Sequence, residues 1–485
     1  MNTLEAVYQR APVWLQSLLM NGHAWRIERH RYGAPFRDAV KRLATMEQWD
    51  EERIRAYQDE RIRHVVQTAY EQSPYYRESM RAAGVHPAEI RGAQDLARLP
   101  LLTKDIVRSR GADLQTSPTP APGWHAGHTS GTTGTPLAMW YDQTTCVMTN
   151  AVDRRHKQWV GLGDDDWIGL LLGRVIVPAH QQRPPFWRTN HIQKQVWFSS
   201  FHLSEEHMAS YVREIQRRRL RFLEGYPSTL FILAKYVLQR GIELPMDAVI
   251  TSSETLHEVQ RQTIEAAFDC KLFDFYALAE RVIYAGECEA HVGKHLAETY
   301  GYTEVVDDDG DPVPDGGCGY LVGTSLHNLA MPMIRYRTSD VSRIMTETCA
   351  CGKSLRRIQD VTTKAEDIVV TPDGRMISPS VLTHPFKPLE HIAASQIVQE
   401  RLDHLVVKLV AADQPSHEEE HALLQSLRDR LGDDMTIEIR NVSAIPRDPS
   451  GKLRWVVSKV PHSYLVPWAT DERRLESIER TAAPV

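Results

Sequence analysis

Residues 128–136, HTSGTTGTP, combine small hydroxyl side chains and glycines more densely than any other stretch of the sequence. Gly131 and Gly134 let the backbone adopt positive φ and approach a ligand closely. Hydroxyl groups accompany the backbone N–H groups at Ser130, Thr132, Thr133 and Thr135. Donors of this kind surround phosphate oxygens, so the stretch predicts a phosphate-binding loop.

The loop alone does not distinguish a nucleotide site from a surface turn. The spacing of a Walker phosphate loop is absent, and so is the G-x-G-x-x-G pattern of a dinucleotide fold. A turn rich in serine, threonine and glycine explains the stretch equally well. The decision therefore depends on the rest of the chain.

Composition excludes several classes of function. The 485 residues are 42% hydrophobic and 25% charged, which predicts a globular protein of two or three domains. A net charge of −6 offers no basic field for nucleic acid, and RRRLR at 217–221 is interpreted as the solvated face of a helix. No stretch approaches the roughly 18 to 20 apolar residues of a membrane span, and the first residues lack the apolar core of a secretion signal. We expect a cytoplasmic location and no membrane partner.

The order of the predicted elements indicates an α/β fold. Residues 1–115 have apolar residues at helical spacing, and strand-like flanks enclose the Gly/Ser/Thr loop. Beyond them, strands alternate with helices, including one helix through 211–221, and each strand runs into a small polar turn. The predicted strands are 167–178, 222–228, 247–254 and 271–280. Ligands of such sheets bind along the carboxyl ends of the strands.

Two further changes of pattern follow. Residues 296–345 predict β-hairpins, with DDDGD at 307–311 as a hairpin turn rather than a calcium loop, because the twelfth position is Cys318 instead of glutamate. The composition changes again near residue 362. We predict a large N-terminal domain over 1–362 and a small α+β domain over 363–485.

Five turns in one order resemble the adenylate-forming superfamily. They are TSGTTGTP (129–136), SSE (252–254), YALAE (276–280), RYRTSD (335–340) and PSGKLR (449–454). SPYYRE and LPLLTKDIV upstream, with ASQIVQE downstream, are similar to its phenylacetate–CoA ligase and CapK-like subgroup. The resemblance implies a large adenylation domain of mixed sheets layered with helices, followed by a small mobile domain.

The resemblance implies roles for individual residues. The loop Ser130–Gly134 would hold the β- and γ-phosphates of ATP, with Thr132 assigned a catalytic part. Glu280 would hold Mg²⁺, because an oxygen ligand suits a hard cation. Lys452 would stabilise charge between the substrate carboxylate and the α-phosphate.

Other residues would bind the nucleoside and the acid. Tyr276 would lie against adenine, with the backbone of Ser252, Ser253 and Glu254 along the edge of the base. Asp340 would accept hydrogen bonds from the ribose hydroxyls. The acyl pocket is assigned to Tyr226, Pro227 and Ala279.

Several positions depart from the family pattern. YALAE has Ala277 for a glycine and Ala279 for a hydroxyl residue, and YRTSD has Ser339 for a glycine. In TKAED, Lys364 replaces the ribose-binding arginine and Glu366 the hinge aspartate. Lysine lacks the bidentate fork of arginine, and an altered hinge puts the second half-reaction in doubt.

The cysteines suggest a structural zinc site. Cys349 and Cys351 form a C-x-C pair followed by glycine, and Cys288 lies seven residues before His295. Three thiolates and one imidazole would form a closed tetrahedral ligand set for zinc. This pattern of cysteines and histidine resembles that of the phenylacetate–CoA ligase subgroup. His291 is the competing ligand, and unliganded reduced cysteines are the alternative.

The predicted activity is the ATP-dependent conversion of a carboxylic acid, of aryl or arylacetic type, to an acyl-adenylate. The acyl group would then pass to coenzyme A. An amine acceptor, giving an amide, is the first alternative, and a catalytically inactive nucleotide-binding protein is the second. The expected partners are the acid, ATP with Mg²⁺ and the acceptor, and a homodimer is one option for the assembly.

Overall fold

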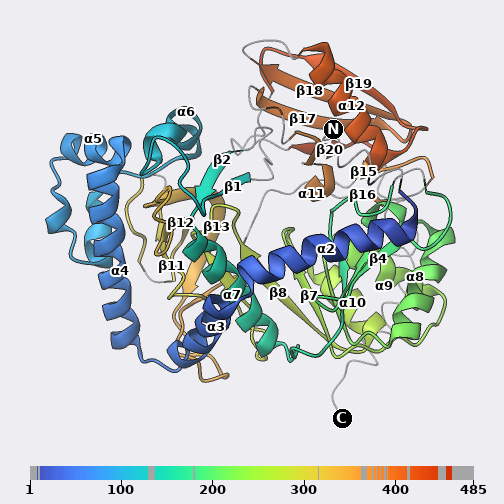
Figure 1. Ribbon diagram of the computed structural model, residues 1–485, viewed down its shortest axis with the longest axis horizontal. Helices are drawn as coiled ribbons and strands as arrows, with labels where there is room; N and C mark the ends of the chain where they lie inside the picture. The colour runs from blue at the N-terminus through green and yellow to red at the C-terminus, as the bar shows by residue number, and fades with distance from the viewer. Residues whose placement is uncertain are drawn as a thin grey trace.

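A computed structural model describes residues 8, 11–128, 137–178, 181–307, 309–314, 316–361, 369–373, 376–377, 379–382, 384–386, 389, 392–411, 416–445 and 455–460. Over these residues it is a mixed α/β fold, with a large sheet region covered by helices and a smaller orange-red unit beside it (Figure 1). None of the helices in this part of the chain combines the length and apolar character needed to cross a bilayer.

The predicted helical N-terminal region is confirmed. Its α-helices are α2 (Val13–Arg31), α3 (Ala34–Met46), α4 (Glu51–Gln72), α5 (Pro74–Ala82) and α6 (Lys104–Leu114). The side chains of Asp50 and Thr103 accept hydrogen bonds from free backbone N–H groups in the first turns of α4 and α6. These caps fix where the two helices start. Helices α4 and α5 stand at one end of the molecule, and α2 crosses the front of the sheet (Figure 1).

The central sheet has twelve strands and is parallel in the middle. In spatial order they are β11 (Gly301–Val306), β12 (Cys318–Ser325), β13 (Tyr336–Met345), β14 (Arg357–Ile358), β10 (Lys294–Leu296), β9 (Tyr284–Gly286), β8 (Lys271–Ala277), β7 (Ala248–Ser252), β6 (Phe222–Gly225), β3 (Ile168–Leu171), β5 (Gln195–Phe198) and β4 (Trp187–Asn190). Strands β8, β7, β6, β3 and β5 pair in parallel. Their carboxyl ends therefore share one edge, as the alternating pattern predicted.

Helices α8 (Glu205–Arg218), α9 (Pro227–Gln239) and α10 (Glu258–Phe268) connect parallel strands of this sheet, and α7 (Gln143–Trp159) precedes β3. Strands β1 (His125–His128) and β2 (Ala138–Tyr141) pair on either side of the Gly/Ser/Thr loop. The loop residues 129–136 themselves lie outside the described part of the chain. The strand-like flanks are thus confirmed, and the structure of the loop stays a prediction.

Two predicted boundaries were wrong. The strand expected over 167–178 ends at Leu171, and two residues later Gly173 lies close to the Tyr226 ring. The helix expected over 211–221 spans Glu205–Arg218 and ends where Arg219 adopts a left-handed conformation. Arg217 and Arg218 both pair with buried Glu214, and Leu220 is buried, but Arg217, Arg219 and Arg221 are exposed. The basic run is therefore solvated, as predicted, although it lies at the end of the helix and just beyond it.

The hairpins predicted within 296–345 are confirmed as β11, β12 and β13. The Asp307 carboxylate accepts hydrogen bonds from the backbone N–H groups of Asp309, Gly310 and Asp311. This arrangement closes a tight turn, as expected for DDDGD.

The C-terminal unit has its own four-stranded sheet. In spatial order the strands are β19 (Thr436–Asn441), β18 (His404–Ala411), β17 (Ile392–Arg401) and β20 (Val456–Ser458), with α12 (His417–Leu431) beside them. Apolar residues of this unit form one cluster with Phe201 and Tyr226 of the large domain. The small domain therefore packs against the edge where β6 ends.

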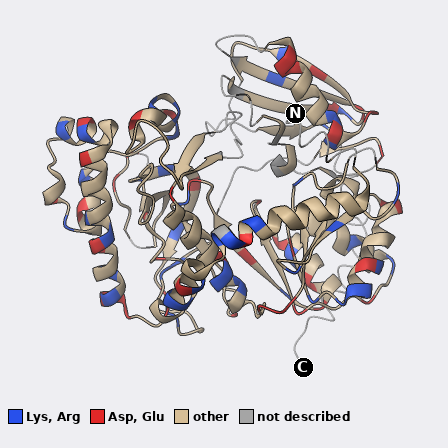
Figure 2. Cartoon of the chain, in the orientation of Figure 1, with Lys and Arg blue, Asp and Glu red and all other residues tan. Residues whose placement is uncertain are grey.

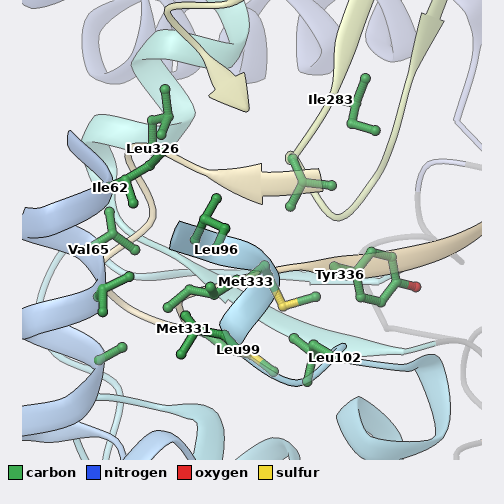
Figure 3. Close-up of a cluster of buried hydrophobic side chains, with 14 of the residues drawn as sticks. Ile62, Val65, Leu96, Leu99, Leu102, Ile283, Leu326, Met331, Met333 and Tyr336 are labelled. Carbon is green, nitrogen blue, oxygen red and sulfur yellow. The ribbon is translucent and has the colours of Figure 1, made fainter. Parts of the chain in front are cut away.

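The hydrophobic core beside β13 joins the N-terminal helices to the sheet. Ile62 and Val65 of α4 meet Leu96, Leu102 and Met333 there (Figure 3). Arg335, which is 3% exposed, donates to the carbonyls of Ala97 and Leu99 and pairs with Glu304. On the face shown in Figure 2, cationic and anionic residues are interspersed over the helices.

Candidate active site

The polar turns predicted to bind ligand follow neighbouring strands at one sheet edge. Tyr226 follows β6, Glu254 follows β7 and Glu280 follows β8. Because these strands are parallel and adjacent, the three residues come from the same edge although they span 54 positions of sequence. In open α/β sheets, ligands bind at this edge of the strands.

Glu280 is held by a tyrosine from another strand. Its carboxylate Oε1 accepts a hydrogen bond of 2.7 Å from the hydroxyl of Tyr336, the first residue of β13. Glu280 is 8% exposed, so the carboxylate is largely removed from water. A buried carboxylate is stable when hydrogen-bonded or bound to a cation, which suits the predicted magnesium ligand.

Asp340 lies on the same strand and meets Tyr276. The Tyr276 hydroxyl donates to Asp340 Oδ2 at 2.7 Å. Burial raises the pKa of Tyr276, and the Asp340 carboxylate raises it further, so the hydroxyl stays protonated and remains a donor. The structure thus brings together Tyr276, Glu280 and Asp340, which the sequence placed up to 64 residues apart.

Three turns around this cluster have left-handed backbone. The φ angles are +71° at Ser253, +57° at Arg281 and +51° at Arg335. Each residue carries a side chain, and such conformations cost on the order of 1–3 kcal/mol and concentrate at functional sites. They adjoin Glu254, Glu280 and Tyr336.

The predicted adenine and acyl residues lie on the neighbouring strand ends. Ser252 ends β7, and Glu254 accepts a hydrogen bond of 3.1 Å from the backbone N–H of Ser228 near the start of α9. Pro227 begins that helix. Burial raises the pKa of Tyr226 to about 12, so this side chain contributes a neutral hydroxyl to the edge.

The described departures from the family pattern lie at exposed positions. Ala277, Ala279 and Ser339 are all exposed, whereas Tyr336 and Thr338, on the face of β13 opposite to Ser339, are buried. An extra hydroxymethyl group at Ser339 therefore does not crowd Asp340. Lys364, Glu366 and Lys452 lie outside the described residues, together with Ser130, Gly131, Thr132, Thr133 and Gly134.

Sequence reasoning missed two tyrosines. Tyr336 lies within the quoted RYRTSD turn, and strand alternation places it on the same face as Asp340, which was the available signal. Tyr141 at the end of β2 donates its hydroxyl to the carbonyl of Ala279, and Arg281 stacks on its ring at 3.9 Å. No pattern in the sequence links Tyr141 to residues 279–281, because the contact joins distant segments.

A second polar cluster lies behind the sheet edge. Cys288, His295, Cys349 and Cys351 place their ligand atoms within 4.8 Å of one another. The Cys288 and Cys349 Sγ atoms are 3.6 Å apart, and Cys351 Sγ lies 3.2 Å from His295 Nε2. These separations fit the edges of a tetrahedron around zinc, whose bonds to sulfur and nitrogen are about 2.0–2.3 Å.

Neighbouring groups prepare His295 as a ligand. Its Nδ1 lies 3.0 Å from the carbonyl of Leu355 and donates to it, which leaves Nε2 facing Cys351. Burial lowers the pKa of His295 to about 4 and raises that of Cys288 to about 12. The imidazole is therefore neutral, and a bound metal cation would stabilise the thiolate form of Cys288 and release its proton to solvent. His291, the competing ligand, instead has Nδ1 3.6 Å from Glu287.

Comparison with known proteins agrees with this fold and these motifs. Residues 369–459 match the family described as the CapK C-terminal domain. The chain is 27% identical over 444 residues to phenylacetate-coenzyme A ligase of Thermus thermophilus, which covers 84% of this chain and 96% of that protein. It is 23% identical over 471 residues to Protein CapK of Staphylococcus aureus, covering 94% and 100%.

A comparison with solved structures also finds a CoA ligase. A 2-hydroxyisobutyryl-CoA ligase in complex with 2-HIB-AMP and CoA, in the thioesterification state, superposes with a TM-score of 0.56 at 20% identity, covering 89% of this chain and 93% of that one. The fold is therefore that of the adenylate-forming CoA ligases. Within this class, the predicted resemblance to the phenylacetate–CoA ligase and CapK-like subgroup is confirmed.

Proposed function

We propose that this protein is an AMP-forming acid–thiol ligase. A substrate carboxylate oxygen attacks the α-phosphorus of ATP, and pyrophosphate leaves. The thiol sulfur of coenzyme A then attacks the acyl carbonyl, and AMP leaves. The observation that carries the proposal is the cluster of Tyr276, Glu280 and Asp340 at one edge of a parallel sheet, in the order that the family motifs require.

Each residue of this chain has a task in the proposed reaction. Asp340, oriented by Tyr276, accepts hydrogen bonds from the ribose, and the Tyr276 ring supports the base. Glu280 would hold Mg²⁺, which neutralises phosphate charge when bound. We assign the phosphates to the loop Ser130–Gly134 and the reacting oxygens to Lys452, on the basis of the motifs alone.

We assign the acyl group to the edge near Tyr226. An aryl or arylacetic acid is the proposed substrate class, because the ring of Tyr226 and the adjoining Pro227 place apolar groups where β6 ends. Relatives carry the name phenylacetate-coenzyme A ligase, which supports this class. A bound zinc at Cys288, His295, Cys349 and Cys351 is proposed as a structural ion, since all four tetrahedral positions are protein ligands.

Isotope exchange between pyrophosphate and ATP tests the first half-reaction. The full-length protein should catalyse exchange with one or more acids from a panel of benzoic, arylacetic and short aliphatic acids. Addition of coenzyme A should then give a thioester and AMP in equal amounts, whereas amines in its place should give no amide. Binding of ATP without exchange for any acid would favour an inactive nucleotide-binding protein.

A further inference from the structure

Tyrosine hydroxyls restrain Glu280 at two points, one at its carboxylate and one at the backbone of the residue before it. Tyr336 donates to its Oε1 atom at 2.7 Å, and Tyr141 donates to the carbonyl of the preceding residue, Ala279. The following residue, Arg281, stacks on the Tyr141 ring and has a φ of +57°. Side chain and backbone at this position are therefore both restrained.

Tyr336 is itself held firmly. It is 3% exposed, and its ring lies at the edge of the hydrophobic core, with the hydroxyl directed away from the other labelled side chains (Figure 3). The backbone of Leu102 brackets the residue, since Leu102 N–H donates to the Arg335 carbonyl at 3.0 Å and Arg337 N–H donates to the Leu102 carbonyl at 2.9 Å. The hydroxyl thus has one fixed position at which to meet a carboxylate.

This contact also gives a role to the segment LPLLTKDIV, which the motifs of the site did not explain. Leu102 forms an isolated parallel bridge with Tyr336, and Leu99 supplies a carbonyl to Arg335. The segment therefore supports the strand start from which Tyr336 projects.

We propose that Tyr336 is a positioning residue, which fixes the rotamer of Glu280 through one carboxylate oxygen and so directs the other toward the cation of the ATP complex. This inference rests on the proposed function. A free glutamate side chain loses rotamer entropy when it binds a metal, and a side chain already held by a hydrogen bond loses less. Burial and the neighbouring Glu280 and Asp340 carboxylates raise the pKa of Tyr336, so it remains a donor across the physiological range.

Tyr336→Phe tests the proposal, with Tyr76→Phe as the matched control. Tyr76 lies in the same core, and its hydroxyl donates to the Pro332 carbonyl at 2.9 Å and accepts from Ile334 N–H at 3.0 Å, far from any assigned ligand group. Mg²⁺ affinity is measured by calorimetric titration of Mg²⁺ into the ATP-saturated protein. We expect Tyr336→Phe to weaken Mg²⁺ binding about tenfold, the typical effect of losing a hydrogen bond to a charged group. Tyr76→Phe should lower the melting temperature without changing Mg²⁺ affinity.

A double-mutant cycle with Glu280→Gln identifies the route of the effect. If Tyr336 acts through Glu280, Tyr336→Phe should cause no additional loss of Mg²⁺ affinity in the Glu280→Gln background. An equal tenfold loss in both backgrounds would contradict the proposal, as would a Tyr336→Phe protein with wild-type Mg²⁺ affinity.

The same titration separates the two hypotheses. A wild-type protein that binds ATP with Mg²⁺ but catalyses no pyrophosphate exchange contradicts the proposed function, and the Tyr336→Phe comparison still decides the positioning role. A wild-type protein that binds ATP equally well with and without Mg²⁺ overturns the positioning role, whatever the exchange assay gives.

Discussion

At the scale of single residues, the site consists of carboxylates whose partners are neutral hydroxyls. The Tyr276 hydroxyl donates a hydrogen bond to Asp340, and the Tyr336 hydroxyl donates one to Glu280, both at 2.7 Å. A neutral donor orients a carboxylate and preserves its charge, whereas a lysine or arginine would compete with the proposed cation or the ribose. This choice of partner suits the proposed ligand, which carries both a metal and hydroxyl groups.

The proposed adenylation chemistry requires a cation at the reacting oxygens, and Lys452 is the residue assigned to supply it. Lys452→Ala should lower the rate of pyrophosphate exchange by at least about a hundredfold, because a preorganised cation at the displacement is lost. ATP binding, measured by calorimetry, should change by less than about threefold. Lys459→Ala is the control, since this lysine of the same domain is paired with Glu400 at 3.7 Å. Exchange at the wild-type rate in Lys452→Ala would exclude the assignment.

At the scale of elements, local signals predicted more than the contacts that complete the site. The parallel strands could be predicted, since apolar runs ended in polar turns near Gly225, Ser252 and Ala277. The start of α8 was missed although Ser204 and two glutamates mark it. The early end of β3 at Leu171 was missed, because the apolar run continues to Val177 in the sequence.

In the candidate site, too, local motifs could be predicted from the sequence and contacts between distant segments could not. Glu280 and Asp340 could be assigned because each belongs to a short motif with a fixed order. Tyr141 could not, because its bond to the Ala279 carbonyl joins segments 138 positions apart. The metal ligands lie between these cases. The C-x-C pair and His295 were assigned from the sequence with His291 as the competing ligand, and the structure separates the two histidines, because His291 Nδ1 lies 3.6 Å from Glu287.

The cysteine cluster joins the β9–β10 hairpin to the loop between β13 and β14. The purified protein should contain about one zinc per chain, and Cys349→Ser should lose the metal and lower the melting temperature, because four-ligand zinc sites stabilise the segments they connect. Elemental analysis and calorimetry measure both quantities. Cys318→Ser, at an exposed cysteine of β12, should retain metal and stability. A metal-free wild-type protein would refute the site.

Arg335, directly before β13, forms a buried ion pair with Glu304 of β11 and also donates to the carbonyls of Ala97 and Leu99 in the N-terminal helical region. Its Nη2 lies 3.2 Å from Glu304 Oε1, and burial raises the pKa of Glu304. Arg335→Met should destabilise the protein by about 3–5 kcal/mol in urea unfolding, because Glu304 is left buried without a cation. Adding Glu304→Gln should recover part of this loss. If the double variant is no more stable than the single one, the cost comes from the lost carbonyl contacts instead.

At the scale of the whole molecule, the small domain covers the edge that carries the proposed acyl pocket. Val381 of that domain and Tyr226 both lie against Gly173, where an added Cβ would be 3.0 Å from each side chain. Arg430 of α12 stacks over the ring of Phe201 at 5.7 Å. A movement of the small domain would therefore change the surroundings of Tyr226 directly, which links domain position to the acyl group in the proposed reaction.

Stability against acid is also a property of the whole molecule, since it depends on histidines buried far from the site. Burial lowers the pKa of His327 to about 4, and its Nε2 donates to the Thr299 carbonyl at 2.8 Å. In the unfolded chain the imidazole binds a proton near pH 6.5. The folded-state pKa is thus depressed, so the contribution of neutral His327 to stability is complete above about pH 6.5 and is lost as the pH falls toward 4, amounting to roughly 3 kcal/mol.

Substitution isolates this contribution from those of other groups that titrate in the same range. Asp274, for example, has its pKa raised to about 6 by burial, which opposes acid unfolding. His327→Gln keeps an amide donor for the Thr299 carbonyl and removes the titrating ring. Between pH 6 and 5 the wild type should lose about 1 kcal/mol more unfolding free energy than the variant, measured by urea titration at each pH. His23→Gln, at an exposed position, controls for the removal of one histidine. Identical pH dependence in the wild type and His327→Gln would mean that the buried imidazole is already protonated in the folded protein.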